Sequence, residues 1–168
     1  MAKNKGVLIV ISGPSGAGKG TICKALLEKH KDIHLSVSAT TREPRQGEVH
    51  GVNYYFLNKD EFLKKVEEDD FLEWAEVYGN CYGTPKSNVQ ELLDSGKDVI
   101  LEIDIQGALK VKENTEEGVF IFILPPSMEE LKQRIINRVS ETPESLMRRF
   151  NSAYLEINYF SNYIYAVV

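Results

Sequence analysis

The stretch Gly13-Pro-Ser-Gly-Ala-Gly-Lys-Gly-Thr21 decides the fold because of the segments on either side of it. It follows the apolar, strand-like run Gly6-Val-Leu-Ile-Val-Ile-Ser12 and leads directly into a helical pattern that begins near Lys19. A glycine-rich turn between a strand and a helix can point successive backbone N–H groups at an anion, and the positive end of the helix dipole adds to the attraction. The stretch therefore predicts a phosphate-binding loop that opens a βα unit.

The spacing of Gly13, Gly18 and Lys19 matches the nucleotide-binding pattern, in which the lysine reaches the β- and γ-phosphates. One position departs from that pattern. A Ser or Thr that ligates Mg²⁺ usually follows the lysine, whereas this chain has Gly20, with Thr21 one place later. We therefore expect Mg²⁺ to be held by phosphate oxygens and water, with a more distant carboxylate orienting the waters. The alternative is a glycine-rich turn without a ligand.

Other apolar runs indicate further strands buried on both faces. Asp98-Val-Ile-Leu-Glu-Ile-Asp104 and Val119-Phe-Ile-Phe-Ile-Leu124 are continuous and rich in β-branched residues. Helical patterns cover residues 21–30, 127–138 and 143–159, and residues 163–168 resemble a last strand. Alternating strands and helices predict an α/β fold of the P-loop NTPase type, with three α/β/α layers around a parallel sheet.

The segment from about residue 35 to 95 interrupts this alternation. It contains a polar stretch with arginines, alternating residues around Tyr54-Tyr-Phe56 and a strand-like piece at 71–78. We interpret it as a small, mostly β insertion beside the phosphate loop, where a second substrate would bind. Residues 1–34 and 96–168 then form the core of a single domain that spans 1–168, and 168 residues suffice for a proper core.

Composition excludes several functional classes. A formal net charge of -5 disfavours general binding to nucleic acid or to a membrane surface. The two cysteines, Cys23 and Cys81, lie far apart, and no histidine stands at metal-ligand spacing, so neither a disulfide nor a zinc site is indicated. No signal peptide or membrane span is expected before the loop. We expect a soluble protein in a reducing cytoplasm.

A second set of motifs runs through the rest of the chain. It comprises Ser36-Val-Ser-Ala-Thr-Thr-Arg-Glu-Pro-Arg45, Gly47-Glu-Val-His-Gly-Val-Asn-Tyr-Tyr-Phe56, Phe71-Leu-Glu-Trp74, Tyr82-Gly-Thr84, Leu101-Glu-Ile-Asp-Ile-Gln-Gly107 and Pro125-Pro-Ser127, with arginines at 134, 138 and 149. Over essentially its whole length the chain closely resembles the guanylate kinase family. The resemblance implies transfer of the γ-phosphoryl group of ATP to GMP or dGMP with Mg²⁺, in purine nucleotide metabolism.

The resemblance also implies a GMP-binding set. Guanine presents N1–H and an exocyclic amine side by side, so one carboxylate can accept both, whereas adenine has an acceptor at N1. By resemblance Glu73 is that carboxylate, and Thr84 donates to O6. Guanidinium groups and tyrosine hydroxyls suit the monophosphate. The whole implied set is Ser38, Arg42, Arg45, Tyr54, Glu73, Tyr82, Thr84 and Asp104.

The remaining implied residues concern ATP, the metal and catalysis. The ATP-binding set is Gly13, Pro14, Ser15, Gly16, Ala17, Gly18, Lys19, Gly20, Thr21, Arg134 and Arg138, and the catalytic set is Lys19, Arg42, Arg138 and Arg149. Residues from about 134 to 149 correspond to a lid that closes over the transferring phosphate. Glu102 and Asp104 end a buried strand, where a carboxylate needs a cation or a hydrogen-bond donor. The resemblance assigns them to the Mg²⁺ waters and to the guanine side of the cleft, with a capping or turn role for one of them as the alternative.

Other interpretations remain open at this stage. Scaffold proteins contain guanylate kinase-like modules that bind phosphorylated peptides without catalysis, but such modules usually lose the phosphate loop. A kinase for another nucleoside monophosphate is a further alternative.

Family members continue past the strand at 163–168 with a turn and a helix, so the chain resembles one that lacks its C-terminal helix, and we expect weaker ATP affinity. The remaining aromatic residues are expected in the core, namely Tyr55, Phe56, Trp74, Tyr154, Tyr159, Phe160, Tyr163 and Tyr165.

Overall fold

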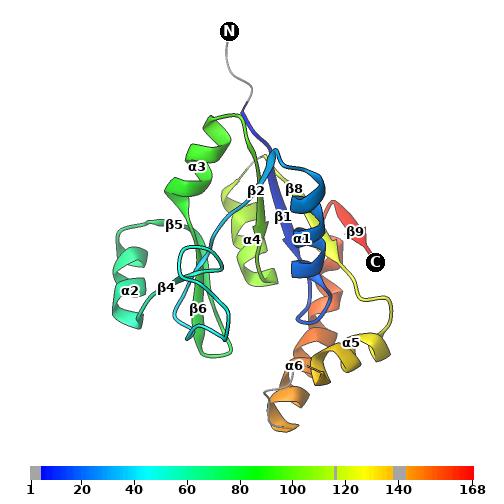
Figure 1. The fold of residues 1–168 in the computed structure, drawn as a ribbon. Coiled ribbons are helices and arrows are strands. Elements are labelled where there is room, and N and C mark those ends of the chain that lie inside the picture. Colours follow the sequence, from blue (N-terminus) through cyan, green and yellow to red (C-terminus); the bar gives the residue numbers. More distant parts are fainter. Residues whose placement is uncertain (1–4, 116, 138–142) are drawn as a thin grey trace.

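The computed structural model describes residues 5–115, 117–137 and 143–168 and contains two sheets (Figure 1). The first has the strand order β2-β7-β1-β8-β9 and is parallel throughout. Its strands are β1 (Leu8–Ser12), β2 (Ile33–Leu35), β7 (Asp98–Glu102), β8 (Val119–Ile123) and β9 (Tyr165–Val167). The predicted parallel α/β architecture is confirmed.

Helices cover both faces of this sheet. On one face, α3 (Lys86–Asp94) and α4 (Ile105–Asn114) pack against apolar side chains of β1 and β7. On the other face, α1 (Lys19–Lys29) packs through Cys23 and its neighbours against β1, β7 and β8. Alternate residues of each strand point to opposite faces, and both faces are apolar because both are covered. The core therefore forms three layers.

The second sheet has the order β4-β3-β6-β5 and stands beside the first (Figure 1). Its strands are β3 (Ala39–Thr40), β4 (Tyr55–Phe56), β5 (Phe71–Val77) and β6 (Asn80–Pro85), and β5 and β6 form an antiparallel hairpin. Helix α2 (Lys59–Glu67) begins with a capping box at Asn58 and stacks Phe62 on Phe71 with ring centroids 4.6 Å apart. Helix α3 contacts β5 and β6 as well as β7, so it joins the two sheets.

The C-terminal part of the described chain forms a helical arm and the last strand. Helices α5 (Met128–Ile136) and α6 (Pro143–Ile157) pack through Leu131, Ile135 and Ala153, and a 3₁₀ turn, η1 (Asn158–Asn162), leads to β9. The Ser127 side chain accepts a hydrogen bond from Glu130 N–H and caps α5. Within the described ranges no helix is both long and apolar enough to cross a membrane.

Two sequence expectations need correction. The strand predicted over 98–104 ends at Glu102, because Asp104 adopts the extended conformation of a helix N-cap and begins α4. Half of the aromatic residues expected in the core are exposed, namely Tyr154, Tyr159, Phe160 and Tyr165, whereas Tyr163 packs edge-on against Phe122. The exposed four lie on α6, η1 and the edge strand β9, on faces that no described element covers.

Candidate active site

A cleft of about 500 Å³ lies between the loop after β1, the C-terminal end of β7, the second sheet and α6. It brings together side chains that are far apart in the sequence, because parallel strands place the loops at their carboxyl ends side by side. Of the residues assigned from the sequence, the cleft is lined by Gly13, Ser15, Gly16, Gly18, Lys19, Gly20, Ser38, Arg45, Tyr54, Glu73, Tyr82, Glu102, Asp104 and Arg149. Pro14, Ala17, Thr21, Arg42, Thr84 and Arg134 do not line it directly, and Arg138 lies outside the described residues.

The loop after β1 has the tight backbone that a phosphate cradle requires. Gly13, Gly16 and Gly18 all have positive φ angles, and a Cβ at Gly13 would lie 2.4 Å from the Ile123 carbonyl oxygen. The Lys19 ammonium donates to the carbonyl oxygens of Gly13 and Pro14 at 2.6 and 3.1 Å. The cation therefore lies over the loop, beside the N-terminus of α1, where an anion is attracted.

Arg134 reaches the same loop from α5. Its Nε donates to the Glu130 carboxylate at 2.8 Å, and one terminal nitrogen donates to the Ala17 carbonyl oxygen at 3.2 Å. A Cβ at Gly18 would lie 3.4 Å from that nitrogen. The guanidinium is thus held against the phosphate loop.

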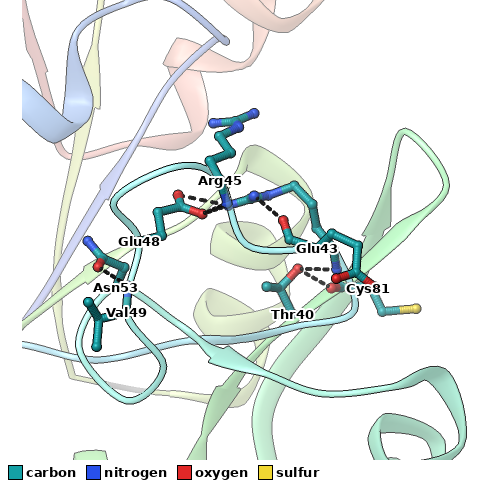
Figure 2. Close-up of polar contacts among 8 residues, drawn as sticks. Thr40, Glu43, Arg45, Glu48, Val49, Asn53 and Cys81 are labelled. Atoms are coloured by element: carbon teal, nitrogen blue, oxygen red, sulfur yellow. Dashed lines mark hydrogen bonds and ion pairs between the residues drawn. The ribbon is translucent and has the colours of Figure 1, made fainter.

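Arg42 and Arg45 are held by one carboxylate, that of Glu48. The Arg42 guanidinium donates to both Glu48 oxygens at 2.9 Å, and the Arg45 backbone N–H donates to one of them at 2.7 Å. Burial opposes the ionised state of Glu48, but these donors outweigh it and lower the pKa of the carboxyl group. Figure 2 shows the Arg45 side chain extending away from Glu48. Arg45 therefore presents its guanidinium to the cleft, while Arg42 stays paired.

Aromatic rings complete this corner of the site. The Arg42 guanidinium lies 5.6 Å from the ring centroid of Tyr54 and 5.9 Å from that of Phe56, within cation–π range. Tyr54 and Tyr82 lie edge to face with centroids 6.1 Å apart, and both line the cleft. Burial, reinforced by the charge of Glu102, raises the pKa of Tyr54, so its hydroxyl remains a hydrogen-bond donor.

Glu73 is a carboxylate in a nearly dry position, 5% exposed on β5. Its cross-strand partner Thr84 donates its hydroxyl to Glu73 Oε1 at 2.6 Å. Burial and the nearby charge of Asp104 raise the pKa of Glu73 to about 7, although Thr84 and Lys110 act in the opposite direction. In this state the Thr84 proton is engaged by Glu73 and is not directed at a base in the cleft.

Gly107 gives Glu73 the space that its position requires. A Cβ at Gly107 would lie 2.5 Å from Glu73 Oε2, closer than any real contact. Asp104 accepts hydrogen bonds from the N–H groups of Gln106 and Gly107 and caps α4, and it lines the cleft as well, so a capping role does not exclude one in the site. The start of α4 therefore supplies the wall against which the carboxylate rests.

Glu102 lies beside the phosphate loop. A Cβ at Gly20 would lie 3.3 Å from Glu102 Oε1. Gly20, which stands where a Ser or Thr usually follows the lysine, is therefore next to a carboxylate. Such an oxygen suits a hydrated Mg²⁺ ion. Among the described residues no three His, Cys, Asp or Glu side chains gather at metal-binding distance. The position of Glu102 beside Gly20 fits a carboxylate that orients the waters of such an ion.

Three contributors to the site escaped the reasoning from sequence. Glu48 lies inside a motif that carried the family resemblance, but its pairing with Arg42 depends on a turn that the sequence does not specify. Gly107 was part of another motif, but only the structure shows that a side chain at this position would collide with the Glu73 carboxylate. Tyr78 lines the cleft from the tip of the β5–β6 hairpin and carried no sequence signal at all.

Comparisons with known proteins agree with this geometry. The family model described as Guanylate kinase matches residues 5–168. A guanylate kinase from Clostridium perfringens (strain SM101 / Type A) is 79% identical over 165 residues, which are 98% of this chain and 76% of that protein. A guanylate kinase from Caldanaerobacter subterraneus subsp. tengcongensis is 65% identical over 99% of this chain and 81% of its own length.

Solved structures agree as well. The crystal structure of guanylate kinase from Anaplasma phagocytophilum has a TM-score of 0.82 and 41% identity, and the match covers 100% of this chain and 79% of that one. Shikimate kinase from Acinetobacter baumannii, at a TM-score of 0.50 and 15% identity, shares the fold alone. The phosphate loop, the buried glutamate and the match over residues 5–168 together show that this chain belongs to the guanylate kinase family.

Proposed function

We propose that this chain carries out the reaction of its family, the transfer of the γ-phosphoryl group of ATP to GMP to give ADP and GDP. The observation that carries the proposal is the position of Glu73. It is a buried carboxylate in the same cleft as the phosphate loop and Lys19. A site that joins a phosphate cradle to a reader of paired N–H donors fits a kinase that acts on a guanine nucleotide.

GMP binds, in this proposal, against the second sheet. Ionised Glu73 accepts the guanine N1–H and amine protons, and Ser38, Thr84 and Asp104 lie beside the base. Adenine would leave the carboxylate unpaired in a dry site, which is costly. Arg45, Tyr54 and Tyr82 contact the monophosphate. Arg42 contacts it as well, with its guanidinium donating hydrogen bonds to both Glu48 and the phosphate.

ATP binds on the other side of the cleft. The backbone of residues 13–21 cradles its phosphates, Lys19 leaves the loop carbonyls for the β- and γ-phosphates, and Arg134 flanks the loop. Arg149 reaches the transferring group from α6, with Arg138 assigned the same role. The GMP phosphate oxygen is already anionic, so it attacks without a general base. The protein's task is to align two polyanions and exclude water.

Mg²⁺ belongs to the proposal as the ATP-bound ion. Glu102 and Asp104 would hold it through water, because Gly20 offers no hydroxyl next to Lys19. When bound, the ion neutralises phosphate charge. The finer division of the chain is also proposed: a core of 1–34 and 96–168, a GMP-binding insertion of about 35–95 and a lid of about 134–149, acting in the cytoplasm in purine nucleotide metabolism.

The non-catalytic alternative has no support in the comparisons, where relatives at 79% and 73% identity are guanylate kinases. The direct test is ADP formation from Mg-ATP with GMP, dGMP, AMP, CMP, UMP or no acceptor, assayed side by side. We expect turnover with the two guanine nucleotides only. The deoxy nucleotide is included because no assigned residue reads the 2′-hydroxyl. Equal turnover with AMP, or none with GMP, would refute the proposal. Glu73→Ala and Arg45→Ala variants should both lose turnover with GMP.

A further inference from the structure

The tip of the β5–β6 hairpin carries an aromatic residue in a strained backbone conformation. Val77 pairs with Asn80, so Tyr78 and Gly79 form the loop, and their φ angles are 52° and 80°. Two positive φ angles in a two-residue loop indicate a type I′ turn, whose first position favours Asn, Asp or Gly. A tyrosine there is costly. Such outliers persist where the residue serves a function, and they are a reason to look for one.

Packing does not explain the choice of tyrosine. Tyr78 is 49% exposed and belongs to none of the apolar clusters formed by the described residues. The hairpin would be easier to form with asparagine at this position. The benefit of the ring must therefore come from what it contacts outside the hairpin.

The ring contacts the opposite wall of the cleft. The guanidinium carbon of Arg149, on α6, lies 5.2 Å from the centroid of the Tyr78 ring, which is within cation–π range. Both residues line the cleft that contains Lys19 and Glu73. Figure 1 shows the β5–β6 hairpin and α6 at the same end of the molecule. The contact thus joins the sheet that carries Glu73 to the helix that carries Arg149.

We propose that Tyr78 is a positioning residue, which holds the Arg149 guanidinium at the mouth of the cleft for the phosphoryl-transfer step. A long arginine side chain loses rotamer freedom when it engages a substrate, and a ring that already restrains it reduces that loss. The inference rests on the proposed function, because the role assigned to Arg149 belongs to that reaction. It adds to it a residue outside the assigned site and a link between the two walls.

Two substitutions separate the ring from the backbone. Tyr78→Asn removes the ring and leaves a residue that tolerates the positive φ angle, whereas Tyr78→Phe keeps the ring. We expect Tyr78→Asn to lower kcat about two- to fivefold, the range of an exposed cation–π contact, with KM for both nucleotides unchanged. Its melting temperature should be equal to or above that of the unsubstituted protein. Tyr78→Phe should retain the unsubstituted kcat.

A double-mutant cycle with Arg149→Ala decides between positioning and a structural role. If Tyr78 acts through Arg149, Tyr78→Asn has no further effect on kcat in the Arg149→Ala background. Additive effects, or equal kcat values for the Asn and Phe variants, would overturn the inference. This reading holds even if Tyr78→Asn changes stability, because a loss of stability persists in the Arg149→Ala background. Absence of GMP-dependent turnover in the unsubstituted protein would instead overturn the proposed function.

Discussion

Replacing Glu73 by glutamine should stabilise the substrate-free protein while impairing its reaction. Burial raises the pKa of Glu73 from 4.5 to about 7, so the folded protein binds this proton more tightly than the unfolded chain does. The stability contributed by the protonated form is therefore complete below pH 4.5 and is lost as the pH rises through 7. Above that range the folded protein carries a desolvated charge that glutamine would not carry.

The magnitude follows from the same pKa. At about 1.4 kcal/mol per pH unit, a rise from 4.5 to about 7 corresponds to about 3 kcal/mol above pH 7. For a chain of this size, that corresponds to about 6–12 °C in melting temperature. Glutamine keeps the shape of the side chain and an oxygen for the Thr84 hydroxyl. Glu73→Gln should therefore melt higher than the unsubstituted protein at pH 8 and at the same temperature at pH 4.5.

The assay is thermal denaturation of both proteins between pH 4.5 and 8, without nucleotides. Glu76→Gln is the matched control, since Glu76 lies on the same strand but is exposed, and it should show no such pH dependence. The same Glu73→Gln variant should lose about 10- to 100-fold in kcat/KM for GMP, because an amide cannot accept both guanine donors. A difference in stability that is independent of pH would refute the reasoning about desolvation.

Three further predictions concern neighbouring groups. Gly107→Ala places a Cβ 2.5 Å from Glu73 Oε2 and should raise KM for GMP about tenfold or more, with KM for ATP unchanged. Steady-state kinetics that give the variant and the unsubstituted protein the same KM for GMP would contradict this. Glu48→Gln removes the ion pair that orients the Arg42 guanidinium, so it should weaken GMP binding about tenfold in calorimetry and leave guanosine binding unaffected. An equal loss of affinity for both ligands would disprove the role in phosphate binding. Lys19→Met should lower kcat by about 10²–10³-fold while GMP still binds, and near-normal turnover would exclude the lysine from catalysis.

The phosphate loop and the fold class could be predicted because they depend on local sequence. A glycine-rich turn, an apolar run before it and a helical pattern after it are all readable along the chain. The predictions from sequence were wrong where tertiary contacts decide the end of a strand or the burial of a side chain. Asp104 leaves the predicted strand because its side chain caps α4, and four predicted core aromatic residues are exposed because burial depends on which element covers a face.

The phosphate loop was therefore determined by the sequence itself, and the residues assigned to guanine and to the monophosphate followed from the family resemblance that the sequence carries. The physical state of those groups was decided only by the folded chain. Burial on β5 holds the pKa of Glu73 near 7, and Glu48 orients two arginines through a turn of the second sheet. Tyr78 meets Arg149 across the cleft although 71 positions separate them in the chain. Desolvation, ion pairing and ring contacts depend on distances in space, and spacing along a sequence does not specify those distances.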